Sequence, residues 1–170
     1  KKQQYIMSEE NVEQTTVAPV EKWNLDAFKR HYSNDDTPDA IKWLWENFDE
    51  KDAVFYDSVF NDNADLKGNQ LFMTLNLING FWRPLEKLHK NGFASAVILG
   101  DKDNQELHML WLFKGQGLPE DVTQAELGIP FAERFTMTKL DHNDEKTRKD
   151  INDYLLWSSQ IKGKDFLDGK

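Results

Sequence analysis

The sequence contains no cysteine among its 170 residues. Disulfide bonds, zinc sites built from thiolates and a cysteine nucleophile are therefore excluded. The sequence also has no Asn-x-Ser/Thr glycosylation acceptor and no apolar signal segment. Because these features mark secreted proteins, their absence predicts a reducing, cytoplasmic setting.

Long hydrophobic runs are missing, and positive charge is scarce. No stretch approaches the roughly 20 apolar residues that a helix needs to cross a bilayer, so we expect no membrane insertion. The 21 Lys and Arg residues are outnumbered by 30 Asp and Glu residues, which gives a formal net charge of -9. Since non-specific attraction to nucleic acid rests on Lys and Arg, only a local basic patch would bind phosphates.

Catalytic and metal-binding motifs are also scarce. The four histidines, His31, His89, His108 and His142, lack the spacing of metal ligands. The GQG sequence at residues 115–117 lacks the lysine and third glycine of a phosphate loop, and no serine has the flanking glycines of a nucleophile elbow. The sequence therefore predicts a protein that is not an enzyme, with no cofactor and no metal. A deep pocket that brings His and Asp together would revive the enzyme hypothesis.

What the sequence does have is aromatic bulk, with 11 Phe and 6 Trp residues. A chain of this length buries roughly 70% of its unfolded surface, which is enough for one domain. Residues 1–20 are polar and aperiodic, so they are interpreted as a linker remnant or flexible tail, and residues 21–170 as the domain.

Two helices are expected before residue 50. Asn24 is expected to cap the first, which the SNDDT segment at residues 33–37 ends. Thr37 is expected to cap the second, with Pro38 at its first position. Trp43 falls outside the apolar stripe of the second helix. The expected buried faces are Leu25, Phe28 and Tyr32 in the first helix and Ile41, Leu44, Trp45 and Phe48 in the second.

Beyond residue 50, strands and helices alternate. Residues 71–90 form a helix that Gly80 and Pro84 are expected to kink near Gly80 and that a left-handed cap at Asn91-Gly92 ends. A last helix at residues 144–156 packs Ile151, Tyr154 and Leu155. The expected strands are 53–60, a hairpin of 93–99 with 107–113, and 131–140 after a long connection with one helical turn. This order predicts an α+β fold, with an antiparallel sheet of about four to five strands covered by helices.

The stretch FWRPLEKLHKNG at residues 81–92 is basic and aromatic, although the whole chain is acidic. An amphipathic helix with a basic outer face explains it. FKRHY at residues 28–32 also combines basic and aromatic residues. If the basic faces of these two helices met, they would form a patch that could bind RNA or an acidic protein segment. The candidate partner-binding residues are Lys29, Arg30, Trp43, Asn76, Arg83, Lys87 and Lys90.

Two of these candidates have simpler interpretations as structural residues. Trp43 is equally explained as a partly covered surface ring. Asn76 is equally explained as a buried side chain that satisfies loop amides.

Several strings occur in a specific order along the chain. They are WNLDAFKRHYSNDDT at 23–37, WENFD at 45–49, FMTLNLINGFWRPLEKLHKNGFASAVILG at 72–100, WLFKGQ at 111–116 and TKLD at 138–141. Together they resemble the C-terminal domain of the gamma subunit of eukaryotic elongation factor 1, part of the elongation factor 1B complex. Pro84 is a departure, because an arginine is expected there and Arg83 lies one place earlier. Residues 117–130 also lack the expected tryptophan and are poor in aspartate.

The resemblance implies a ferredoxin-like fold and no catalytic residue. It implies a non-catalytic structural role that supports the subunits exchanging guanine nucleotides during protein synthesis. The partners would be other subunits of the complex, met mainly through a glutathione-transferase-like N-terminal domain that this chain lacks. RNA binding through the basic-aromatic helix faces is the alternative function.

Overall fold

A computed structural model describes residues 22–123 and 131–170 of the chain. The chain divides into two compact units, residues 1–48 and 49–170. The tail expected at residues 1–20 lies outside the described residues, as does part of the long connection, residues 124–130.

The described part of the first unit contains two helices, α2 (Leu25–Asn34) and α3 (Thr37–Asn47). The predicted cap of α2 is confirmed, because Asn24 Oδ1 accepts a hydrogen bond of 2.7 Å from the Ala27 amide. The predicted cap of α3 is wrong by one residue. The Asp36 carbonyl accepts the first helical bonds, so Asp36 is the N-cap and Thr37 is already helical. In the stripes expected to be buried, Tyr32, Trp45 and Phe48 are only half-buried.

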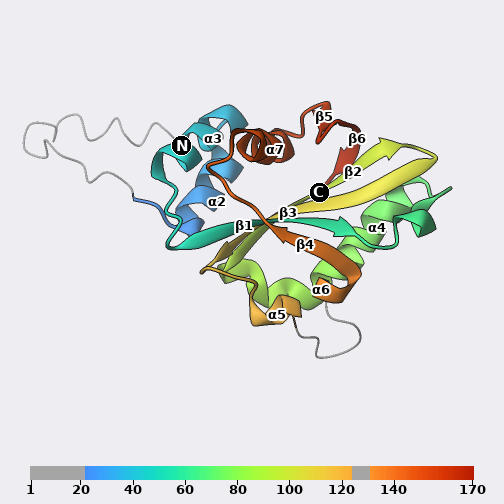
Figure 1. Cartoon of the computed structure of the whole chain (residues 1–170), viewed down its shortest axis with the longest axis horizontal. Coiled ribbons are helices and arrows are strands. Elements are labelled where there is room, and N and C mark those ends of the chain that lie inside the picture. The colour runs from blue at the N-terminus through green and yellow to red at the C-terminus, as the bar shows by residue number, and fades with distance from the viewer. Residues whose placement is uncertain (1–21, 124–130) are drawn as a thin grey trace, which may run out of the picture. The chain divides into compact units, whose positions relative to one another are not determined.

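The second unit is built on an antiparallel sheet with the strand order β4-β1-β3-β2-β6-β5. Helix α4 and the short helices α5 and α6 lie on one side of this sheet, and α7 lies on the other (Figure 1). The strands are β1 (Ala53–Phe60), β2 (Gly92–Asp101), β3 (Asn104–Lys114), β4 (Phe135–Lys139), β5 (Gln160–Ile161) and β6 (Lys164–Gly169). The helices are η2 (Asn63–Leu66), α4 (Leu71–Trp82), η3 (Arg83–Lys90), α5 (Glu120–Thr123), α6 (Phe131–Arg134) and α7 (Glu145–Leu156).

The hairpin of β2 and β3 is the centre of the sheet, as its continuous apolar sequence predicts. Alternate residues of β3 point to opposite faces, so Met109 and Trp111 enter the core beneath α4, while His108 and Leu110 face the other side. The core beneath α4 also takes Val54 and Phe60 from β1, Ile78 and Phe81 from α4, Leu85 and Leu88 from η3, and Ala96 and Ile98 from β2.

The helix predicted over residues 71–90 changes type after Trp82, and its α-helical part runs without a break past Gly80. It continues as α4 through Trp82 and becomes the 3₁₀-helix η3 at Arg83. Pro84 explains why the α-helix ends here, because proline has no amide hydrogen to donate to the next α-helical hydrogen bond. The left-handed cap is also wrong: Asn91 has φ −119°, and Gly92 already begins β2. Gly92 fits a tight site, since a Cβ there would lie 3.3 Å from the Leu88 carbonyl oxygen.

The strand predicted over residues 131–140 is shorter than expected. Residues 131–134 form α6, and β4 begins at Phe135, opposite Phe60, which is the last residue of β1. β1 therefore ends where β4 begins, and beyond this pair the Asn61 amide donates a hydrogen bond of 2.9 Å to the Arg134 carbonyl oxygen.

The C-terminal hairpin of β5 and β6 was not predicted. It raises the sheet to six strands in place of the four to five expected, while the α+β class and the antiparallel pairing are confirmed. None of the described helices is both long and apolar enough to cross a membrane.

Candidate functional site

One face of α4 is turned away from the core. With about 100° per residue in an α-helix, Phe72, Met73, Asn76, Asn79 and Gly80 fall within one arc of roughly 120°. All five are exposed, and the two apolar side chains are unusually so, at 59% for Phe72 and 45% for Met73. We call these five residues the α4 outer face. Large apolar side chains gathered on an exposed helix face are typical of contact surfaces.

The rest of α4 is fixed to the sheet by packing and by one buried polar contact. Ile78 and Phe81 enter the core, and Thr74 Oγ1 donates a hydrogen bond of 2.6 Å to Gln105 Oε1 on β3. Gln105 Nε2 in turn donates to the Asn69 carbonyl oxygen at 2.7 Å, just before α4 begins. The outer face is therefore presented on a rigid element.

The sequence candidates of the second unit lie on α4 and η3. Asn76 is exposed, so its interpretation as a buried side chain that satisfies loop amides is wrong. Arg83 and Lys90 are exposed at the two ends of η3. The side chain of Lys87 lies outside the described part of the structure.

The other three candidates belong to the first unit. Arg30 is exposed, and Lys29 is half-buried, where burial lowers its pKa against the opposing effect of Asp26. Trp43 is half-buried and stacks on His31 and Trp23, with ring centroids 4.5 and 6.0 Å apart, as expected for a partly covered ring. Because these residues and those of η3 lie in different units, the joint basic patch stays a prediction.

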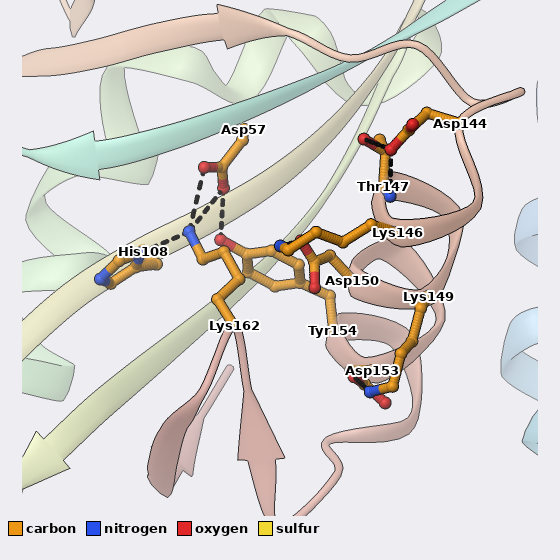
Figure 2. Close-up of polar contacts among 10 residues, drawn as sticks. All are labelled: Asp57, His108, Asp144, Lys146, Thr147, Lys149, Asp150, Asp153, Tyr154 and Lys162. Carbon is orange, nitrogen blue, oxygen red and sulfur yellow. Dashed lines mark hydrogen bonds and ion pairs between the residues drawn. The ribbon is translucent and has the colours of Figure 1, made fainter.

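A second constellation, on the sheet face that carries α7, was not predicted. Lys162 Nζ donates to both oxygens of Asp57 at 3.0 and 3.1 Å and to His108 Nδ1 at 2.6 Å, as Figure 2 shows. The Tyr154 hydroxyl donates to Asp57 Oδ1, and Lys162 Nζ lies 5.2 Å from the centre of the Tyr154 ring. β1, β3, α7 and the turn between β5 and β6 therefore meet at one half-buried ion pair.

The chain of contacts continues along the sheet. His108 Nε2 lies 3.0 Å from Glu106 Oε1, and Lys164 Nζ lies 3.1 Å from Glu106 Oε2. Burial lowers the pKa of His108, and the Lys162 cation lowers it further, against the raising effects of Glu106 and Asp57. A neutral ring with Nδ1 accepting from Lys162 and Nε2–H donating to Glu106 satisfies every partner.

The neighbouring groups respond to the same surroundings. Burial raises the pKa of Tyr154 well above its usual value, and the adjacent Asp57 carboxylate acts in the same direction. Burial alone would raise the pKa of Glu106, but the hydrogen bonds to His108 and Lys164 together outweigh it and lower the pKa. We call Asp57, Glu106, His108, Tyr154, Lys162 and Lys164 the polar chain.

The polar chain joins charged groups to one another, which suits holding elements together. The described residues contain no cluster of three His, Asp or Glu side chains placed to hold a metal ion. Two sequence signals could have indicated part of this constellation. Asp57 interrupts an otherwise apolar and aromatic strand, and Lys162-Gly163 is a turn dipeptide between short strand segments.

The chain is similar to proteins named elongation factor 1-gamma. A family model described as "Elongation factor 1 gamma, conserved domain" matches residues 10–117. A "Probable elongation factor 1-gamma" from Caenorhabditis elegans is 40% identical over 147 residues, covering 86% of this chain and 36% of the relative. "Elongation factor 1-gamma" from Homo sapiens is 34% identical over 162 residues, covering 89% and 35%.

The chain thus spans about a third of the length of the curated relatives that it matches. The matched family region contains α2, α3, the whole of α4 and η3, and the central hairpin. On these matches, the chain belongs to the elongation factor 1-gamma family.

Proposed function

We propose that this chain is a non-catalytic interaction domain of the elongation factor 1B complex, and that the α4 outer face contacts the guanine-nucleotide exchange subunits. The observation that carries the proposal is the exposure of Phe72 and Met73 on a helix whose opposite face packs against the core. Membership of the elongation factor 1-gamma family supports the choice of partner.

The charge of the α4 outer face favours a protein partner over RNA. From Leu71 to Trp82 the sequence has no charged residue, although 30% of the whole chain is charged. Protein interfaces have apolar cores depleted of charge, whereas binding to a phosphate backbone needs several Lys and Arg side chains. Arg83 lies at the end of this helix as a cationic rim for an acidic partner surface.

The remaining parts of the proposal follow from the family and from the order of elements. Residues 21–170 would be the C-terminal domain of a longer gamma subunit that works in the cytoplasm. A ferredoxin-like classification is supported by the strand order β4-β1-β3-β2, with helices connecting β1 to β2 and β3 to β4. β6 and β5 would then be an extension beyond β2.

Binding of purified exchange subunits to the chain tests the proposed function. The double substitution Phe72→Ala and Met73→Ala should weaken binding at least about tenfold, because buried aromatic anchors contribute most to interface affinity. Lys146→Ala on α7 is the matched control, since its side chain is 79% exposed and its ion pair with Asp150 is a surface one. Equal affinity of the wild type and the double variant would remove the α4 outer face from the interface.

RNA is the competing occupant, and the same variants test it. Binding to RNA would fall steeply with salt and would be insensitive to Phe72→Ala and Met73→Ala, because its affinity would come from phosphate contacts. That outcome would favour a nucleic acid over a protein as the partner of this domain.

A further inference from the structure

The turn of the C-terminal hairpin places a lysine where the backbone disfavours it. Lys162 and Gly163 link β5 to β6 and have φ of 55° and 78°. A two-residue turn with both φ values positive usually has Asn, Asp or Gly at its first position. A lysine there is strained, and such strain persists where the surroundings hold the residue in place.

The Lys162 side chain fixes the turn in place through its contacts with residues of the sheet. The Lys162 ammonium group has three hydrogens, and its partners are the two oxygens of Asp57 and His108 Nδ1. The Asp57 and Lys162 side chains are each only 18% exposed, so the contact is shielded from water. β6 begins two residues after Lys162 and pairs with β2, which makes the turn the anchor of this strand.

The groups facing His108 come from every described element around the polar chain. Asp57 lies on β1, Glu106 on β3 and Lys162 in the hairpin turn, and the Tyr154 hydroxyl of α7 donates to Asp57 beside Lys162. Lys164 on β6 pairs with Glu106. In this arrangement the imidazole must accept a hydrogen bond from a lysine, which only its neutral form can do.

We propose that His108 is a proton-operated release for the C-terminal hairpin: when its Nδ1 takes up a proton, Lys162 loses its acceptor and faces a second cation, and β6 separates more readily from β2. The inference goes beyond the proposed function and does not depend on the α4 outer face. The lowered pKa of His108 gives the expected sign, because the folded ring resists a proton that the released ring accepts. β6 therefore stays paired with β2 when the pH is above about 6.5, the ordinary pKa of histidine, and it opens more often as the pH falls below that value.

Hydrogen exchange of the backbone amides tests this release. After correction for intrinsic rates, the opening of β6 should rise between pH 7.5 and 5.0, by up to about tenfold per pH unit below 6.5, the limit for uptake of one proton. The amides of β1 and β3 should open less often than those of β6 at every pH, because they exchange only when the whole unit unfolds. Equal opening free energies in β6 and in the central strands would overturn the proposal.

Two variants make the test specific. His108→Asn places an amide oxygen where Nδ1 lies and does not titrate, so β6 should lose its pH response. Lys162→Met keeps the apolar stem but removes the donor, so β6 should open more at every pH and should respond less to pH than in the wild type. A pH response in either folded variant equal to that of the wild type contradicts the release. The ¹⁵N chemical shifts of the His108 ring in the wild type supply a check without mutation. A ring that is protonated at pH 5.0 while β6 stays closed also contradicts the proposed release.

Discussion

Trp157 Cε2 lies 2.7 Å from the place where a Cβ atom on Gly169 would sit. Trp157 is the left-handed C-cap of α7, with φ 51°, and its ring stacks on Phe166 with centroids 5.6 Å apart. Its Nε1 donates to Ser95 Oγ on β2 at 3.2 Å. This one side chain therefore links the end of α7 to both β2 and β6.

Gly169→Ala should destabilise the protein by about 1–3 kcal/mol, as overpacking in a filled region does. The added methyl group would also lie 3.0 Å from the Ala96 carbonyl oxygen, which is backbone and cannot rotate away. Urea denaturation measures the change. Gly117→Ala is the control, since a Cβ there has open space and should leave the free energy of unfolding nearly unchanged. Equal stability of both variants would show that the ring moves aside without cost.

Thr74→Val should cost about 1–3 kcal/mol, because it leaves the buried Gln105 Oε1 without the donor that it has in the wild type. Thr74→Ser retains the hydroxyl and should cost only about 1 kcal/mol for the lost methyl group. Thermal or chemical denaturation compares the two. A serine variant as unstable as the valine variant would mean that packing, and not the hydrogen bond, fixes α4 at this point.

Tyr154→Phe should lower the free energy of unfolding by about 2 kcal/mol, the usual contribution of a hydrogen bond to a charged acceptor. The phenylalanine ring fills the same buried site but cannot donate to Asp57. Denaturation at neutral pH measures the loss. A change below about 0.5 kcal/mol would indicate that Lys162 alone satisfies the carboxylate.

The global stability should fall as the pH is lowered below about 6.5, the ordinary pKa of histidine. Since the folded pKa of His108 is lowered, the unfolded chain binds the proton more readily, and acid favours unfolding. The stability that the neutral His108 ring contributes is complete above the unfolded pKa of this histidine and is lost between its unfolded and its folded pKa. Denaturation midpoints of the wild type and of His108→Asn across this range should diverge. Parallel curves would assign the acid sensitivity to other groups.

Charge reversal at Arg83, Lys87 and Lys90 should slow association with the exchange subunits, more at low salt than at high salt, because rim charges act on the encounter. Stopped-flow or surface-binding kinetics at two salt concentrations measure the association rate. Unchanged rates would exclude these three residues from the contact, while leaving the α4 outer face to be tested by its own variants.

Local features could be predicted from the sequence, and distant contacts could not. The Asn24 cap, β1 and the β2–β3 hairpin depend on neighbouring residues, and the structure confirms them. Asp57 interrupts an apolar strand, yet its partner Lys162 is 105 residues away, and no short-range pattern connects the two.

Side-chain exposure was predicted less well than secondary structure. The apolar sequence of residues 71–82 predicted a helix, but it did not show that Phe72 and Met73 would remain exposed. Apolar residues occur in two phases along this helix, and only the tertiary packing determines which phase meets the sheet.

The central claim is that the α4 outer face docks on the exchange subunits, and site-specific crosslinking tests it most directly. A photo-reactive phenylalanine analogue in place of Phe72 should form a covalent product with an exchange subunit in the assembled complex. The same analogue at the exposed Lys146 of α7 should form little or none. A product of equal yield from both positions, or no product from position 72, would contradict the account.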